Sequence, residues 1–248
     1  MRIAVAGGTG VVGRHLVDIL NRQGHEPVVL ARSTGVDLIT GHGLDAALTG
    51  AHSVVDVSNV ITARGRTSVT FFSTATANLL AAGRRADVAH HVALSIVGVD
   101  RVDLGYYEGK RRQEHLVLNG PIAGTVLRAT QFFEFVEQVL AGVKGPVAPV
   151  PRMLSQPVAA REVALALAVL ATSPTVGPAP DLAGPDQHEM VDLARTVIRT
   201  RQQRRWVLPV RLPGAAGRAM ARGGLLPLSA GPRGSQTFEQ WLSARPPA

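Results

Sequence analysis

The chain has 248 residues, of which 46% are hydrophobic, so it is long and apolar enough to build one sizeable α/β core or two small ones. It contains no cysteine, which excludes disulfide bonds and thiolate chemistry and is compatible with the reducing cytoplasm, where we expect the protein to act. The net charge is +8, but the basic residues are scattered and only 4% of residues are aromatic, so the charge suits an anionic cofactor and we expect no nucleic-acid partner.

Short apolar stretches alternate with amphipathic ones over the first half of the chain. The predicted strands are Arg2–Ala6, Pro27–Ala31, Ser53–Val57, His91–Ser95 and Thr125–Arg128. The predicted helices between them are Val11–Gln23, Leu44–Leu48, Ser68–Gly83 and Tyr107–Asn119. A repeated strand–helix unit of this kind predicts an α/β fold of the Rossmann type, which is a doubly wound parallel sheet with helices on both faces.

The first predicted strand leads directly into a glycine-rich turn and then into the first helix. Gly7, Gly10 and Gly13 let the backbone turn tightly and approach a pyrophosphate without a Cβ in the way. The helix that follows points its free N–H groups at that phosphate. A plain strand-to-helix turn would not need three glycines, so we expect a dinucleotide site here. The residues expected to bind the cofactor at this turn are Gly7, Thr9, Gly10, Val11, Val12 and Gly13.

The end of the second predicted strand indicates which dinucleotide binds. An Asp or Glu at this point would accept hydrogen bonds from the ribose 2′-hydroxyl, whereas this chain has Arg32 followed by Ser33. A guanidinium binds a phosphate through two parallel hydrogen bonds, so Arg32 favours NADP(H) over NAD(H), with Arg14 adding to the positive field. An ordinary exposed loop arginine is the alternative interpretation of Arg32.

Further cofactor contacts are expected at the next two strands. Asp37 falls on or just before a short predicted strand, Val36–Ile39, where it would either bond the adenine amino group or cap a turn. Val57 and Ser58 close the strand Ser53–Val57, and their backbone would pass the nicotinamide ribose. The second of these places lies at the carboxyl end of a parallel strand, where open α/β sheets bind their ligands.

A tyrosine and a lysine one helical turn apart form the candidate catalytic pair. Tyr106 and Lys110 are four residues apart, so their side chains share one face of a helix. An ammonium lowers the pKa of a neighbouring phenol, so Tyr106 could donate a proton to a carbonyl oxygen as hydride arrives. Lys110 would also hold the ribose hydroxyls, and Ser95 would hydrogen-bond the same carbonyl oxygen. Tyr107 could take the place of Tyr106 as the proton donor. The alternative interpretation is that Tyr106 and Lys110 stand at the exposed start of a helix and have no catalytic role.

The second half of the chain is richer in proline and glycine. Helices are predicted at Ala160–Ala171, Gln187–Arg201, Gly214–Arg222 and Ser235–Ser243, a strand at Trp206–Val210, and loops at Ser173–Pro180 and Leu226–Gly234. We interpret residues 131–248 as a small substrate-covering portion built onto the same sheet, so that residues 1–248 form a single domain whose dinucleotide-binding core is residues 1–130. The longest apolar run, Val163–Ala171, is far shorter than the about 20 residues that span a membrane, so no membrane partner is expected.

The motifs together resemble the short-chain dehydrogenase/reductase superfamily, in particular its atypical, NmrA-like branch. The resemblance rests on the glycine turn at Gly7–Gly13, on Leu30–Ser33, on Tyr106-x-x-x-Lys110 and on the segment Leu127–Phe133. It implies a Rossmann fold and a nicotinamide dinucleotide cofactor. It also implies that Ala129 and Thr130 pass the nicotinamide carboxamide and that Gln131, Phe132 and Phe133 line the substrate side, although the phenylalanines could equally pack in a core.

Two functions follow from these expectations. The first is an NADPH-dependent oxidoreductase that reduces a small carbonyl or quinone compound, with Tyr106 as proton donor. The second is an NmrA-like redox sensor that binds NADP(H) and a protein partner without turnover. No metal is expected, because the pair His90–His91 has no acid or second histidine at ligand spacing on a helix, and no pattern marks an oligomer interface.

Overall fold

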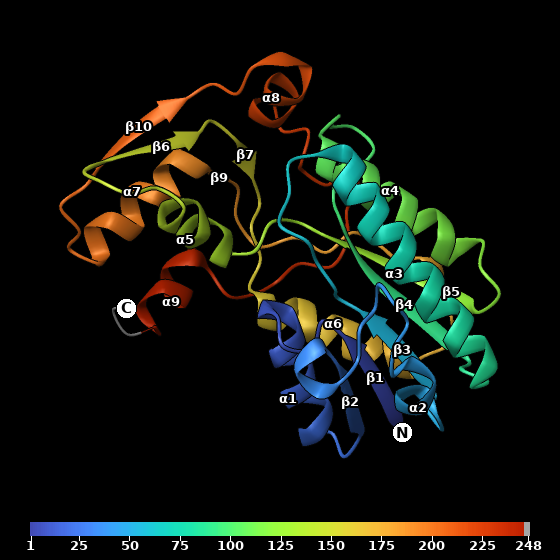
Figure 1. Cartoon of the computed structure of the whole chain (residues 1–248). Helices are drawn as coiled ribbons and strands as arrows, with labels where there is room; N and C mark the ends of the chain where they lie inside the picture. The colour runs from blue at the N-terminus through green and yellow to red at the C-terminus, as the bar shows by residue number, and fades with distance from the viewer. Residues whose placement is uncertain (246–248) are drawn as a thin grey trace. The chain divides into compact units, whose positions relative to one another are not determined.

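The computed structural model describes residues 1–245, which form two compact units. Unit 1 comprises Met1–Ile96, Leu104–Arg128 and Arg161–Pro180. Unit 2 comprises Val97–Asp103, Ala129–Ala160 and the described residues from Asp181 onward. The chain therefore passes between the units several times, and residues 161–180 return to unit 1 (Figure 1).

Unit 1 is built on a six-stranded sheet in the order β2-β1-β3-β4-β5-β8. Its strands are β1 (Arg2–Ala6), β2 (Glu26–Leu30), β3 (Ser53–Asp56), β4 (His90–Ile96), β5 (Ala123–Ala129) and β8 (Gly177–Pro178). The pairs β1–β2, β1–β3, β3–β4 and β5–β8 are parallel. Because β2 and β3 lie on opposite sides of β1, the strand order reverses between β1 and β3. Open α/β sheets bind their ligands at such a switch point, beyond the carboxyl ends of the strands.

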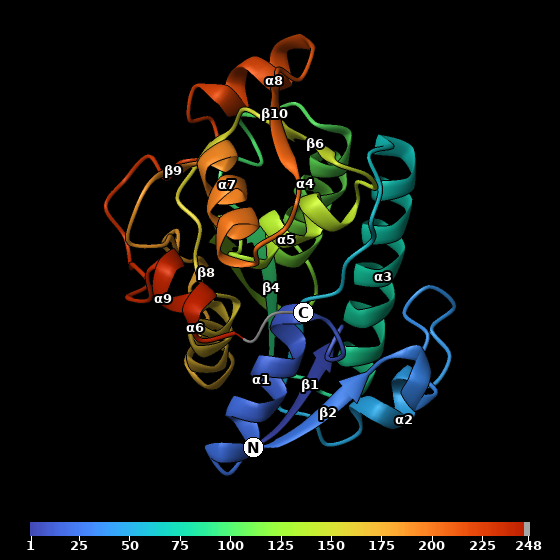
Figure 2. The ribbon, with the colours of Figure 1, turned by 90° about the vertical axis from the view of Figure 1, so that its left-hand side faces the viewer.

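The helices of unit 1 cover both faces of this sheet. They are α1 (Val11–Arg22), α2 (Leu44–Leu48), α3 (Gly65–Arg85), α4 (Gly105–Leu118) and α6 (Ala160–Thr172). Figures 1 and 2 show α3 and α4 lying side by side on one face, with α1 on the other. The core on the α3 face joins alternating strand residues to helix leucines, including Ala4 and Val54 from the sheet and Leu48 and Leu79 from the helices.

The described part of unit 2, which ends at residue 245, contains two small sheets and four helices. The parallel pair is β6 (Val147–Pro151) with β10 (Trp206–Val210), and the antiparallel pair is β7 (Leu154–Ser155) with β9 (His188–Glu189). The helices are α5 (Glu134–Ala141), α7 (Met190–Thr200), α8 (Gly214–Ala221) and α9 (Phe238–Ser243). Thr237 starts α9 with a capping box, in which its hydroxyl accepts from the Gln240 N–H and the Gln240 side chain accepts from the Thr237 N–H.

The structure confirms the Rossmann-type α/β fold and corrects several elements. The short strand expected at 36–39 does not form, because this segment is a turn. The strand Trp206–Val210 has the expected bounds, but it pairs with β6 rather than extending the main sheet. The helix expected from Gln187 begins at Met190, after β9, and the one expected from Ser235 begins at Phe238. Within residues 1–245, no helix is both long and apolar enough to span a membrane.

Candidate functional site

The glycine turn of unit 1 is packed too tightly for larger residues. Gly7 has a φ of +78°, and a Cβ there would lie 2.8 Å from the Val57 carbonyl oxygen. A Cβ on Gly13 would clash with the backbone of Gly7 and Gly8. The turn after β1 therefore lies directly against the end of β3, at the switch point of the sheet.

The start of α1 is suited to an anion. Its N-cap is Gly10, which makes no side-chain capping bond, and no acidic residue stands in the first turn. The N–H groups of Val11, Val12 and Gly13 begin the helix and have no carbonyl partner within it. A turn without Cβ atoms followed by free helix N–H groups fits a dinucleotide pyrophosphate.

Replacing Gly13 by alanine is expected to abolish dinucleotide binding and to lower the free energy of unfolding by about 1–3 kcal/mol, because the new Cβ clashes with backbone that cannot rotate away. Calorimetric titration with NADPH and urea denaturation measure the two effects. Gly142→Ala is the matched control, since a Cβ there meets only ordinary contacts, the nearest at 3.5 Å. A Gly13→Ala protein that binds NADPH normally would contradict the assignment of this turn.

The end of β2 presents a basic, hydroxyl-bearing turn. Arg32, Ser33 and Thr34 form a single turn of 3₁₀ helix directly after β2, and all three are exposed. The Thr34 hydroxyl donates to the carbonyls of Val29 and Ala31 at 2.8 Å and so fixes the turn. Arg32 forms no ion pair within the described chain, which leaves its guanidinium available for an outside anion. Arg14 instead donates to the Thr9 carbonyl at 3.1 Å, on the glycine turn.

Asp37 caps a turn, which is one of the two roles expected for it. Its Oδ1 accepts from the N–H groups of Ile39 at 2.7 Å and Thr40 at 3.1 Å. These backbone hydrogen bonds hold the pKa of the Asp37 carboxyl below its usual value, with a smaller contribution from Arg32. The carboxylate is an Asx-type turn former here, and the strand on which it was expected is absent from the described structure.

Tyr106 lies in the first turn of α4 and is held by a residue that follows β3. Its hydroxyl donates to Asn59 Oδ1 at 2.6 Å. Its ring packs edge-on against Phe72 and Tyr107, with centroids 5.8 and 5.9 Å away. Burial raises the pKa of Tyr106 well above its ordinary value, and Tyr107 raises it further. The phenol therefore stays protonated across the neutral range.

Lys110 does not lower the pKa of Tyr106, contrary to the sequence-based expectation. Its Nζ is buried and donates to the Leu94 carbonyl at 2.6 Å and to Gln113 Oε1 at 2.5 Å. It also lies 4.6 Å from the centroid of the Phe72 ring. Burial lowers the pKa of Lys110 to about 8, although the negative charges of Asp56 and Glu114 act in the opposite direction. The ammonium is directed toward β4 and Gln113 rather than toward the phenol.

A buried relay connects Lys110 to the end of β3. Gln113 Nε2 donates to Asp56 Oδ2 at 2.8 Å, while Asp56 Oδ1 accepts from the Ser58 N–H at 2.9 Å. Asp56 and Gln113 are at most 1% exposed. The carboxylate therefore serves two purposes, since it compensates the buried Lys110 and fixes the backbone at Ser58, beside the glycine turn.

Two buried hydroxyls lie on the strands that carry this site. Ser95 on β4 is 3% exposed, follows the Leu94 carbonyl that Lys110 holds, and its Oγ has no hydrogen-bond partner within the described residues. Ser58, after β3, is also buried with an unpartnered Oγ. Buried polar atoms are normally paired, so both hydroxyls are candidates for a bond to a bound molecule.

The remaining expected site residues belong to unit 2 and are described there alone. Thr130 donates from its hydroxyl to the Gln156 carbonyl at 2.6 Å, and Ala129 bridges to Leu182. Gln131 and Phe132 are half-buried. Phe133 is 1% exposed and packs against Phe238 and Trp241, with both ring centroids 5.5 Å away. Phe133 therefore packs in the core of unit 2, which is the alternative that was expected for the phenylalanines.

The sequence analysis missed Asn59 and Gln113 as site residues. Asn59 follows the expected nicotinamide segment, but only the backbone there was given weight. Gln113 stands three residues after Lys110 and so on the same helix face, which is the one signal that could have found it. No group of three or more His, Asp or Glu side chains between residues 1 and 245 could hold a metal ion.

No protein-family model and no curated protein matches the chain, but solved structures do. An NADPH-dependent quinone oxidoreductase from Escherichia coli is 17% identical, with a TM-score of 0.69 and 98% of each chain covered. The triphenylmethane reductase of Citrobacter sp., solved with NADP(H), is 18% identical, with a TM-score of 0.69 and 92% of this chain and 93% of the other covered. A UDP-N-acetylglucosamine 4-epimerase from Bacillus cereus is 17% identical, with a TM-score of 0.71 and 98% and 96% covered.

These similarities establish the architecture. The chain has the Rossmann-type α/β fold that these two reductases and the epimerase share, and nearly its whole length is included in the match. Because the identities are all below one fifth, the similarity concerns the fold alone, and the chemistry has to be argued from this chain's own residues.

Proposed function

We propose that the protein is an NADPH-dependent oxidoreductase that reduces a small carbonyl or quinone compound. The observation that carries the proposal is the protonated Tyr106 phenol, held by Asn59 in the same compact unit as the tight glycine turn. The NADPH-dependent quinone oxidoreductase and the triphenylmethane reductase, which was solved with NADP(H), share the fold and support the choice.

Several side chains of unit 1 have separate roles in such a reaction. The bound dinucleotide would supply the hydride. Tyr106 donates its phenolic proton to the substrate oxygen, which stabilises the negative charge that develops there. Asn59 Oδ1 accepts the single phenolic proton in the free protein, so the hydroxyl turns from Asn59 to the substrate oxygen in order to donate it. Ser95 offers the same oxygen a second hydrogen bond. Lys110 supports the backbone at Leu94 and keeps a positive charge beside this strand.

Arg32 is the residue proposed to select the phosphorylated dinucleotide. Arg32→Ala is expected to weaken NADPH binding by about tenfold to a hundredfold while leaving NADH binding unchanged, because only NADPH carries the 2′-phosphate that the guanidinium would bind. Affinities for NADPH, NADP⁺, NADH and NAD⁺ measured side by side test this. Arg22→Ala is the matched control, since Arg22 is an exposed arginine of α1 paired with Asp18. Equal binding of NADPH and NADH by the unaltered protein would overturn the role of Arg32.

A dinucleotide sensor without turnover is the second candidate. The observation that favours it is that Lys110 bonds protein atoms rather than the phenol, while burial raises the pKa of Tyr106 and so makes it a weaker acid. A panel of quinones and small carbonyl compounds, followed by NADPH oxidation, separates the two functions. Turnover of any member supports the reductase, whereas tight NADPH binding without turnover supports the sensor.

A further inference from the structure

The small parallel sheet of unit 2 has one buried and one exposed face. In the register of this sheet Trp206 lies beside Val147, and Leu208 beside Pro149. These four apolar residues share the exposed face, where Trp206 is 78%, Leu208 51% and Val147 46% exposed. The other face carries Ala148 and Val150, which are fully buried. We call the four residues on the exposed face the Trp206 face.

The Trp206 face is held firmly rather than carried on a loose loop. Arg205 donates to the carbonyls of Leu140, Val143 and Gly145, at distances between 2.7 and 3.2 Å, and so ties the start of β10 to the segment before β6. At the other end, the Arg152 N–H donates to the Val210 carbonyl at 2.9 Å. The exposed indole and leucine are therefore presented by a fixed platform, and their exposure is a property of the fold.

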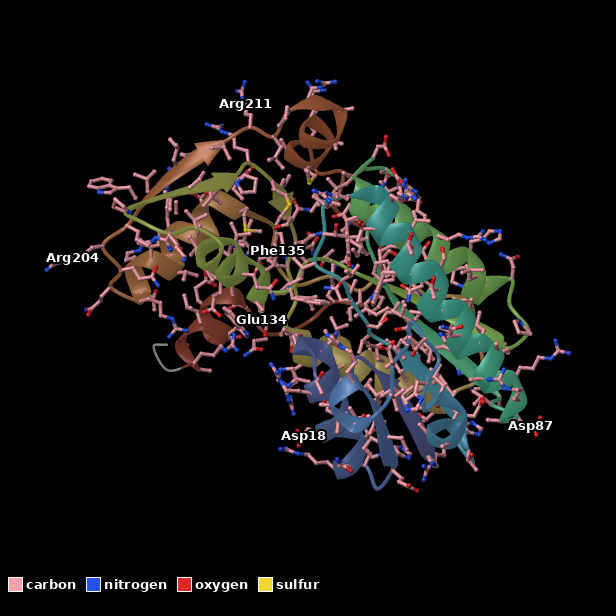
Figure 3. All side chains as sticks on the ribbon, viewed as in Figure 1. Asp18, Asp87, Glu134, Phe135, Arg204 and Arg211 are labelled. Carbon is pink, nitrogen blue, oxygen red and sulfur yellow. The ribbon has the colours of Figure 1, made fainter. Side chains whose placement is uncertain are left out.

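The chain around this face is basic and contains no acid. Residues 193–238, which include β10, contain nine arginines and no Asp or Glu. Residues 138–161, which include β6, contain Lys144, Arg152 and Arg161 and no Asp or Glu. Arg204 and Arg211 flank β10, are exposed, and point outward at its two ends (Figure 3). The two stretches that carry these exposed apolar side chains thus contain positive charge and no negative charge, which is complementary to a surface that is both apolar and anionic.

We propose that the Trp206 face attaches the protein peripherally to an anionic lipid surface. Trp206 and Leu208 insert at the level of the headgroups, where an indole is favourably placed, and Arg204, Arg211 and Lys144 contact the lipid phosphates. The side chains protrude, as insertion into lipid requires. The contact goes beyond the proposed reductase activity, does not depend on it, and differs from the absence of a membrane partner expected from the sequence.

Sedimentation of the full chain with vesicles tests this attachment. Binding is expected to vesicles of phosphatidylcholine mixed with phosphatidylglycerol, to be weak with phosphatidylcholine alone, and to fall as salt is raised. The chain has two tryptophans, of which Trp241 is 6% exposed, so a blue shift of the emission on binding reports Trp206. Trp206→Ser with Leu208→Ser, and separately Arg204→Glu with Arg211→Glu, should each weaken binding by about tenfold or more.

Matched controls lie in unit 1. Leu165→Ser with Val169→Ser removes exposed apolar side chains from α6, and Arg84→Glu with Arg112→Glu reverses exposed arginines on α3 and α4. Both control proteins should bind the anionic vesicles as the unaltered protein does. Equal losses in the controls, or equal binding to neutral vesicles, would overturn the proposal.

Three further outcomes would assign the face to another occupant and thus overturn the proposal. Binding to polyglutamate but not to vesicles would indicate an acidic protein partner, and binding to duplex DNA instead of vesicles would indicate a nucleic acid. A dimer in solution that dissociates on Trp206→Ser with Leu208→Ser would show that a second copy of the chain covers the face.

Discussion

Tyr106→Phe is expected to lower kcat by about a hundredfold to ten-thousandfold, which is the usual contribution of a positioned general acid, while the affinity for NADPH stays unchanged. The phenylalanine keeps the edge-on packing against Phe72 and Tyr107 and removes only the hydroxyl that donates to Asn59. The measurement is kcat with the best substrate of the quinone and carbonyl panel, together with calorimetric titration of NADPH. Loss of kcat at constant NADPH affinity indicates an interaction made in the transition state.

Tyr107→Phe is the control for this experiment. Tyr107 is the neighbouring tyrosine and was the other candidate, yet it is 7% exposed and burial raises its pKa to about 12. Its variant should retain most of the turnover. If Tyr107→Phe is inactive and Tyr106→Phe is active, the proton donor has been assigned to the wrong tyrosine; if both are active, neither phenol is the acid.

The unaltered protein should show no loss of the proposed activity from ionisation of Tyr106 in the neutral range, because burial raises the pKa of this phenol. Lys110 behaves differently, since its pKa is lowered to about 8, and its positive charge is present below that pH and lost above it. A decline of activity as the pH rises through about 8 therefore reports Lys110 rather than Tyr106.

The fold of unit 1 could be predicted because its elements have strong local signals. Each predicted strand is an apolar run ended by a turn, and β1, β3 and α2 lie within a residue of the expected bounds. The glycine turn is similarly local, since its function depends on small residues placed in series between a strand and a helix. Trp206–Val210 was also predictable as a strand, but the sequence does not indicate that its partner is β6.

The side-chain contacts of the site could not be predicted from spacing. Tyr106 and Lys110 occupy one helix face as expected, but which group each one bonds depends on residues far away in the sequence, such as Asn59 and Leu94. The Asp37 carboxylate accepts hydrogen bonds from the N–H groups of Ile39 and Thr40, because the segment after it forms a turn where the sequence predicted a strand. The extent of burial could not be predicted either. Burial raises the pKa of Tyr106, whereas the sequence predicted that it is lowered, and Phe133 lies in a core.

Asp56→Asn is expected to lower the free energy of unfolding by about 3 kcal/mol or more below pH 8, because it removes the only carboxylate on the relay to the buried Lys110 ammonium. The asparagine amide cannot accept from Gln113 Nε2 and from the Ser58 N–H at once, so one donor of the relay is left unpaired. The pKa of Lys110 should also fall below about 8, since Asp56 is the first of the charges that raise it.

The pH dependence distinguishes this loss of charge compensation from simple damage to packing. In both proteins the lysine of the unfolded chain keeps its proton up to its ordinary pKa. The free energy of unfolding therefore rises with pH from the point at which Lys110 of the folded protein loses its proton. In Asp56→Asn that point lies at lower pH, so the stability difference from the unaltered protein should be largest at low pH and should narrow as the pH rises toward about 8. Urea denaturation over this pH range measures the stability difference.

Asp45→Asn is the control, because it removes one carboxylate of an exposed pair with Arg85, and it should change the free energy of unfolding by less than about 1 kcal/mol at every pH. A large difference for Asp56→Asn that does not change with pH would show that the carboxylate fixes the backbone at Ser58 but does not compensate Lys110.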